Sequence, residues 1–159
     1  MKPTCVISCP IDTFSGYGAR SRDFVKSLLK LKNNEWDIFI MPQKWGDTPQ
    51  NFLAPDDDLR SLFRTSQQFN GRQPDIWVQI TIPSEFQPIG RYNIGVTAGI
   101  ESTAYPGDFI EGFNRMNMNL VSSEHSRKVA LTTKYEKIDK STNKVVSVTQ
   151  LEKPLEVLF

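Results

Sequence analysis

Apolar and polar residues follow two different periods along the chain. Short runs of apolar and β-branched residues, bounded by Pro, Gly or Asn, are typical of strands, whereas an apolar position every three or four residues is typical of a helix. Six segments have the strand pattern: 4–9, 36–42, 75–82, 92–100, 118–123 and 154–159. Four segments have the helix pattern: 21–31, a short stretch at 58–64, 106–116 and 123–131.

Strand and helix patterns alternate, which is typical of an α/β fold. The run YNIGVTAGI at 92–100 is nearly continuous in apolar and small residues, as expected of a strand that is covered on both faces. We therefore expect a doubly wound, mainly parallel Rossmann-like sheet with helices on both faces. A chain of 159 residues is long enough for one domain with a core, and we expect 1–159 to be a single domain.

The stretch 132–153 breaks this alternation. Apolar residues flank the turn-prone segment DKSTN on both sides, so we expect a β-hairpin inserted near 132–153. The last segment, PLEVLF, follows it as a strand; its letters LEVLF also match the start of a common tag-cleavage site.

Charge and composition exclude several classes of protein. The 19 basic and 18 acidic residues give a formal net charge of +1, which leaves no electrostatic footprint for nucleic acid. No apolar run reaches the roughly 20 residues of a membrane span, and the start lacks a secretory signal. Cys5 and Cys9 would be about 13 Å apart on one strand, too far for a disulfide. With a single histidine and no further cysteines, we expect no metal site, and a reduced, cytoplasmic setting.

The segment SGYGARSR, residues 15–22, lies between the first strand and the first helix. Glycines there allow a backbone to approach a phosphate at a helix N-terminus, and Arg20 and Arg22 add positive charge. The segment is neither a G-x-G-x-x-G fingerprint nor a P-loop. A phosphate cradle and a plain tight corner are both open interpretations of it.

Polar residues also follow two later strands. In TAGIEST, Glu101 could be a general base, a sugar-hydroxyl acceptor or a solvated loop acid, with Thr97 and Ser102 nearby. In VSSEHSRK, Ser123 is a candidate N-cap, and the following amides could receive an anion. His125 has no nucleophile signature around it and is expected on the surface of a helix.

The ordered set of SGYGARSR, PDIWVQITIP, YNIGVTAGIES, NLVSSEHSRK and KPLEVLF resembles the N-terminal lobe of GT-B glycosyltransferases, which have two Rossmann-like lobes. The resemblance is greatest to the large retaining group of the group-1, family-4 kind, which uses nucleotide-sugar donors and includes forms carried by bacteriophages. It covers nearly all of the chain except the expected hairpin.

This resemblance implies roles for individual residues. The first-strand loop would face the donor diphosphate. Many relatives carry a histidine near the cleft that this chain lacks, so either Glu101 takes its catalytic place or the acceptor chemistry differs. Donor-facing residues would be Gly16, Tyr17, Gly18 and Arg20. Acceptor-side residues would be Thr97, Gly99, Ser102, Ser123, Glu124 and Arg127, of which the last three match a recurrent S-E-x-x-R turn that is also structural.

The resemblance also implies what the chain lacks. The second, donor-binding lobe is absent, so we expect sugar transfer from a nucleotide sugar to an acceptor only when that lobe is supplied, and no cofactor besides the donor. An exposed half-cleft would favour self-association. The alternative function is a stand-alone Rossmann-like module that binds a nucleotide or a protein without catalysis.

Overall fold

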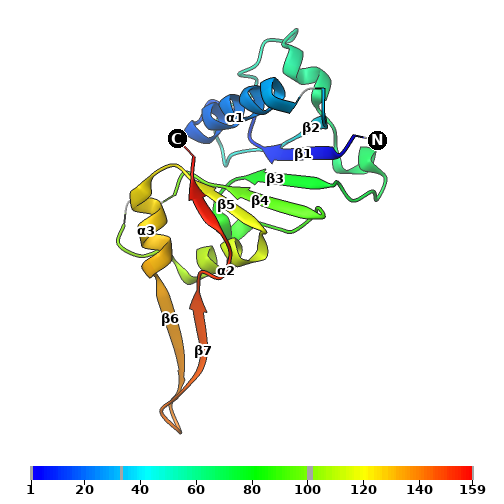
Figure 1. The fold of residues 1–159 in the computed structure, drawn as a ribbon. Coiled ribbons are helices and arrows are strands. Elements are labelled where there is room, and N and C mark those ends of the chain that lie inside the picture. Colours follow the sequence, from blue (N-terminus) through cyan, green and yellow to red (C-terminus); the bar gives the residue numbers. More distant parts are fainter. Residues whose placement is uncertain (1, 33, 100–101, 159) are drawn as a thin grey trace. The chain divides into compact units, whose positions relative to one another are not determined.

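The computed structural model describes residues 2–32, 34–99 and 102–158. Six strands of these residues form one mainly parallel sheet in the order β2-β1-β3-β4-β5-β8, and two more form a separate antiparallel pair (Figure 1). The strands are β1 (Thr4–Cys9), β2 (Asp37–Pro42), β3 (Ile76–Ile80), β4 (Tyr92–Val96), β5 (Met118–Val121), β6 (Lys134–Asp139), β7 (Lys144–Gln150) and β8 (Leu155–Val157). The predicted α/β class with a parallel, Rossmann-like sheet is confirmed.

Three α-helices and three short 3-10 helices connect these strands. The helices are α1 (Gly16–Lys32), α2 (Gly107–Arg115), α3 (Glu124–Thr132), η1 (Asp58–Leu62), η2 (Ser66–Phe69) and η3 (Pro83–Glu85). The helix predicted at 58–64 is the 3-10 helix η1, while η2 and η3 were not predicted, since a single 3-10 turn has no apolar period to read.

The chain divides into two compact units. The first consists of Met1–Thr81 with Pro88–Ile94, and the second of Ile82–Gln87 with Gly95–Phe159. Strands β1, β2 and β3 belong to the first unit; α2, β5, α3, the β6–β7 pair and β8 belong to the second.

Helix α1 begins five residues earlier than its apolar stripe predicted. The hydroxyl oxygen of Ser15 accepts a hydrogen bond from the amide of Gly18 at 2.9 Å, which is the geometry of an N-cap. A glycine-bearing segment without an apolar period, residues 16–23, therefore precedes the stripe that begins at Phe24. The helix starts at its cap rather than at its first apolar residue.

In the first unit, β1 lies between β2 and β3, and alternate residues face opposite sides of the sheet. Cys5, Ile7 and Cys9 share the face that meets α1, and all three are fully buried. Burial raises the pKa of both cysteine thiols to about 12. The prediction that the two cysteines form no disulfide with each other is confirmed.

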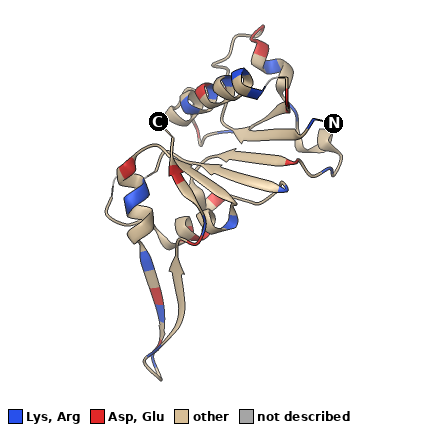
Figure 2. Cartoon of the chain, viewed as in Figure 1, with Lys and Arg blue, Asp and Glu red and all other residues tan. Residues whose placement is uncertain are grey.

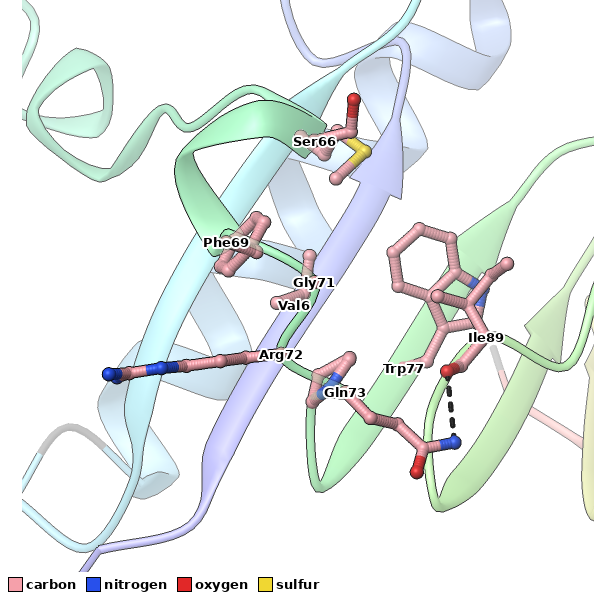
Figure 3. A pocket seen from close by; sticks show the side chains of 10 residues that line it. Val6, Ser66, Phe69, Gly71, Arg72, Gln73, Trp77 and Ile89 are labelled. Carbon is pink, nitrogen blue, oxygen red and sulfur yellow. Dashed lines mark hydrogen bonds between the residues drawn. The ribbon is translucent and has the colours of Figure 1, made fainter.

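The crossover from β2 to β3 contains no α-helix in the first unit. Its residues 43–75 form loops with the two short 3-10 helices η1 and η2. In Figure 3, η2 lies on the side of the strands opposite α1. This face of the sheet is covered by a thin, irregular layer, which leaves room over β1.

In the second unit, the expected hairpin is confirmed as β6 and β7, which pair antiparallel with an irregularity between Lys137 and Ile138 (Figure 1). Two hydrogen bonds anchor its base: the Tyr135 hydroxyl donates to the Tyr105 carbonyl at 2.5 Å, and the Asn114 amide donates to the Gln150 carbonyl at 2.8 Å. The final strand β8 pairs in parallel with β5, which confirms the strand predicted at the end of the chain.

Charged residues of both signs are interspersed along α1 and β6 (Figure 2). Within the described residues, none of the helices is long and apolar enough to cross a bilayer.

Candidate functional site

The strand order places a topological switch point between β1 and β3. The chain leaves β1 toward β2 on one side, and the remaining strands continue from β3 on the other. In open parallel sheets, ligands bind in the crevice outside the carboxyl ends of the two strands at this point. The loop after β1, residues 10–15, is therefore where a ligand site is expected.

Short hydrogen bonds fold this loop into a compact turn. The Thr13 hydroxyl lies 3.0 Å from the Pro10 carbonyl and 2.7 Å from the Ser15 hydroxyl, which in turn caps α1 through Gly18. The two hydroxyls and the Gly18 amide thus form hydrogen bonds with one another. Through them, Ser15 provides an acceptor for one of the amides that have no partner within the helix at its start.

The two glycines of this turn have different environments. A Cβ added at Gly18 would lie 2.7 Å from the Thr13 hydroxyl oxygen and 3.0 Å from the Arg22 guanidinium, and still closer to the Thr13 carbonyl. A Cβ added at Gly16 would meet nothing within 4 Å. Glycine is therefore required at position 18 for close packing, which agrees with the interpretation of this segment as a tight corner. The space beside Gly16 is open.

Arg22 is a structural residue of the turn. Its guanidinium is buried and donates to the carbonyls of Ile11 at 3.0 Å and Thr13 at 2.9 Å. It also lies 3.6 Å from the centroid of the Phe52 ring. Burial lowers the pKa of Arg22 from its usual value, and the nearby negative charges of Asp23 and Asp12 offset part of this shift by raising it. The Arg22 guanidinium, which was a candidate for anion binding from the sequence, instead stabilises the loop at residues 10–15 through these contacts.

A second loop, residues 43–57, runs beside the turn and forms a wall for it. The Phe14 amide donates to the Pro49 carbonyl at 2.9 Å, and the Phe52 amide donates to the Asp12 carbonyl at 3.0 Å. The Asp12 carboxylate accepts from the Leu53 amide at 2.8 Å and pairs with Arg60 at 3.3 Å. The Asp12 side chain is only 13% exposed, so this pair is a well-shielded clamp between the two loops.

Aromatic rings from both loops border the open end of the turn. Tyr17 and Trp45 are stacked with their ring centroids 4.2 Å apart and an interplanar angle of 29°. Phe14 and Phe52 meet edge to face at 5.1 Å and remain 53% and 47% exposed. Of these four residues, only Tyr17 was predicted from the sequence to belong to the site. The aromatic residues within the Pro- and Gly-rich loop at 43–57 were the signal that could have revealed the others.

Among the predicted donor-facing residues, Gly16, Tyr17, Gly18 and Arg20 all lie in the first turns of α1. Arg20 is half-buried. These residues belong to the first unit, whereas every predicted acceptor-side residue belongs to the second.

In the second unit, the loop after β4 is packed tightly against α3. Gly99 has a φ of +92°, and an added Cβ would overlap the Ser126 hydroxyl and lie 3.4 Å from that of Tyr105. Just before it, Thr97 is buried, and the Ala98 carbonyl accepts a hydrogen bond from Ser122. Glycine is needed here both for its backbone conformation and for this close approach.

The remaining polar residues beyond β4 make local contacts. The Ser102 hydroxyl donates to the Ala104 carbonyl at 3.0 Å, and the His125 imidazole Nε2 lies 3.3 Å from the Ser102 carbonyl oxygen. His125 is exposed on α3, as predicted. The predicted catalytic residue Glu101 lies outside the described residues.

The S-E-x-x-R turn at the start of α3 is stabilised internally. The Ser123 hydroxyl accepts from the Ser126 amide at 3.1 Å, which confirms the predicted N-cap. Arg127 pairs with Glu124 at 3.2 Å and donates to the Leu155 carbonyl at 3.4 Å. These contacts fix α3 against β8.

No group of three or more His, Cys, Asp or Glu side chains in the described part of the chain could hold a metal ion. The chain matches no known protein-family model, no curated protein and no solved structure.

Proposed function

We propose that the chain is the N-terminal lobe of a retaining, two-lobed glycosyltransferase, and that its turn at Gly16–Gly18 faces the nucleotide-sugar donor. The observation that carries this proposal is the turn at the β1/β3 switch point. It combines an open helix N-terminus at Gly16 with a border of aromatic rings. A sugar or base can pack on aromatic faces, while a diphosphate is favoured near the N-terminal end of a helix dipole.

The clamp between the two loops supports a binding role for this place. Asp12, Arg60 and the buried Arg22 hold the loop at 43–57 against the turn before any ligand arrives. A preformed wall lowers the ordering cost of binding, because the aromatic side chains are already held near their positions.

Catalysis, in this proposal, requires a second lobe. Transfer from a nucleotide sugar needs cationic or amide groups that stabilise the leaving diphosphate. Arg22 is already engaged by backbone carbonyls and is not free for that role. We expect the second lobe to supply the missing groups. The roles of Glu101 as the catalytic residue and of Thr97, Gly99 and Ser102 on the acceptor side are part of this proposal and rest on the resemblance alone. The 159-residue chain alone should have no transferase activity, either in the cytoplasm, where we expect it to be located, or as the purified protein.

Ligand binding to the isolated chain tests the proposal. Saturation-transfer NMR with a panel of nucleotide sugars, free nucleoside diphosphates and free sugars should detect weak binding by at least one nucleotide sugar. Trp45→Ala removes a stacking surface and should weaken that binding about tenfold. Tyr92→Ala, which removes an exposed aromatic side chain from β4, is the matched control and should leave it unchanged.

Two results would contradict the proposal. The first is the absence of binding by every nucleotide sugar in the panel, and the second is robust sugar transfer by this chain alone. Binding of nucleotides with no preference for the sugar-bearing forms would favour the alternative, a nucleotide-binding module without catalysis.

Self-association is a further part of the proposal, and the hairpin is the surface that supports it. Ile138, Val145, Val146 and Val148 are all 41% or more exposed on β6 and β7. Exposed apolar side chains on a two-stranded arm are a common contact surface between protein molecules.

A further inference from the structure

A trough of about 290 Å³ crosses β1 in the first unit, on the face of the strands that α1 does not cover (Figure 3). The buried side chain of Val6 lies at its floor. Phe69 of η2 forms one wall, and Trp77 of β3 with Ile89 forms the other, as Figure 3 shows. It does not include the turn at the carboxyl end of β1.

Strand register explains why the trough exists. Val6 pairs with Phe39 on one neighbouring strand and with Trp77 on the other, so the three side chains form a row on one face. A small residue between two aromatic ones leaves a gap that its own side chain cannot fill. In an ordinary doubly wound fold the β2–β3 crossover helix would fill it, and here that crossover contains only 3-10 turns.

The walls of the trough are held in place from outside. The Phe69 ring meets the Phe39 ring edge to face at 6.1 Å, and the Arg64 guanidinium lies 4.8 Å from the Phe39 centroid. On the opposite side, the Gln73 side-chain amide donates to the Ile89 carbonyl at 3.2 Å (Figure 3). The trough is therefore a preformed hollow rather than a gap between mobile loops.

The end of the trough is set by a sharp turn after η2. Asn70 and Gly71 both have positive φ, 55° and 76°, which reverses the chain and brings Arg72 to the rim. The Arg72 side chain leaves the backbone at one end of the trough and extends away from Trp77 and Ile89, so that its guanidinium lies beyond the other lining side chains (Figure 3). Among the described residues, none places a carboxylate within ion-pair distance of it.

The lining has a distinctive chemistry. Two aromatic side chains face each other across an apolar floor, Arg72 is the only charged residue, and no acidic residue takes part. We propose that this trough binds a planar aromatic ring that carries an anionic group. The ring lies between Phe69 and Trp77, and the anion lies at the Arg72 end. This site is separate from the proposed nucleotide-sugar site, so either can be wrong without the other.

Fluorine NMR can observe the two sites independently. The chain has three tryptophans, Trp36, Trp45 and Trp77, so a 5-fluorotryptophan-labelled protein gives three signals that single Trp→Phe variants assign. The probe is indole-3-propionate. Indole, which lacks the charge, and propionate, which lacks the ring, are its controls. We expect indole-3-propionate to shift the Trp77 signal saturably and to leave the Trp36 and Trp45 signals in place.

Variants separate the contributions of the ring and the charge. Phe69→Ala removes one wall and should abolish saturation, whereas the control Tyr92→Ala, outside the trough, should not. Arg72→Gln should weaken indole-3-propionate about fivefold, to the level of indole, and should leave indole itself unchanged. Arg72 is exposed, so this variant remains informative if Phe69→Ala does not fold.

Three outcomes would overturn the inference. One is a Trp77 signal that does not move with up to about 20 mM indole-3-propionate, a concentration that would detect even a dissociation constant of several millimolar. Another is a shift of Trp45 instead of Trp77. The third is equal binding of indole and indole-3-propionate with no effect of Arg72→Gln, which would remove the anion from the proposed ligand.

Discussion

Replacing Gly18 by alanine should destabilise the protein, whereas the same replacement at Gly16 should not. The added Cβ at Gly18 would lie 2.7 Å from the Thr13 hydroxyl and still closer to its carbonyl oxygen, which belongs to the backbone and cannot rotate away. Overpacking of this kind costs about 1–3 kcal/mol. Any shift of the Thr13 carbonyl also weakens its bond from buried Arg22, and a hydrogen bond to a charged group is worth about 1.5–3 kcal/mol.

We therefore expect Gly18→Ala to lower the free energy of unfolding by about 3 kcal/mol. Gly16→Ala is the matched control two residues away. Its Cβ meets nothing within 4 Å, and alanine in a helix is favoured over glycine by up to about 1 kcal/mol. Urea unfolding followed by circular dichroism measures both. The account of the turn would be refuted if the two variants had the same stability, or if Gly18→Ala were within about 0.5 kcal/mol of the unmodified protein.

Three further predictions concern burial and the clamp. Cys5 and Cys9 should not react with a thiol reagent at pH 8 unless the protein unfolds. The pKa of each thiol is about 12 in the folded protein and 9.0 ordinarily, so above pH 9 the thiols ionise in the unfolded chain before they ionise in the folded one. Each cysteine should therefore lower the free energy of unfolding by up to about 1.4 kcal/mol for every pH unit above 9. A Cys5→Ala, Cys9→Ala variant that loses stability equally steeply would contradict this. Gly112→Ala should severely destabilise the second unit in thermal unfolding, since its Cβ would overlap the Pro83 carbonyl, whereas Gly107→Ala, with its nearest neighbour 3.8 Å away, should be tolerated. Asp12→Ala should cost about 1–3 kcal/mol in urea unfolding, and a neutral result would show that the clamp is unimportant.

Much of the fold could be predicted from apolar periodicity. All six strands of the sheet, the hairpin and the three α-helices were expected near their observed positions, because each buries a face whose period is visible in the sequence. The start of α1 was placed too late, since its first turn carries two glycines and no apolar period and is defined by the Ser15 cap. The 3-10 helices η2 and η3 have no such period.

The candidate site was predictable only in part. The position of the turn after β1 follows from the order of elements, and its glycines and Tyr17 were found there. The roles of Arg22 and Asp12 could not be predicted, because each depends on contacts with residues of loop 43–57, more than 25 positions away for Arg22 and more than 40 for Asp12. The trough over Val6 likewise depends on the register of three strands.

The most direct test of the central claim, that the turn at the end of β1 faces a nucleotide sugar, is the fluorine spectrum of the 5-fluorotryptophan-labelled chain during titration with nucleotide sugars. Trp45 stacks on Tyr17 at that turn, while Trp77 lies in the trough. We predict a saturable shift of the Trp45 signal with at least one nucleotide sugar, whether or not the Trp77 signal also moves. A Trp45 signal that stays unmoved by every nucleotide sugar would contradict the account.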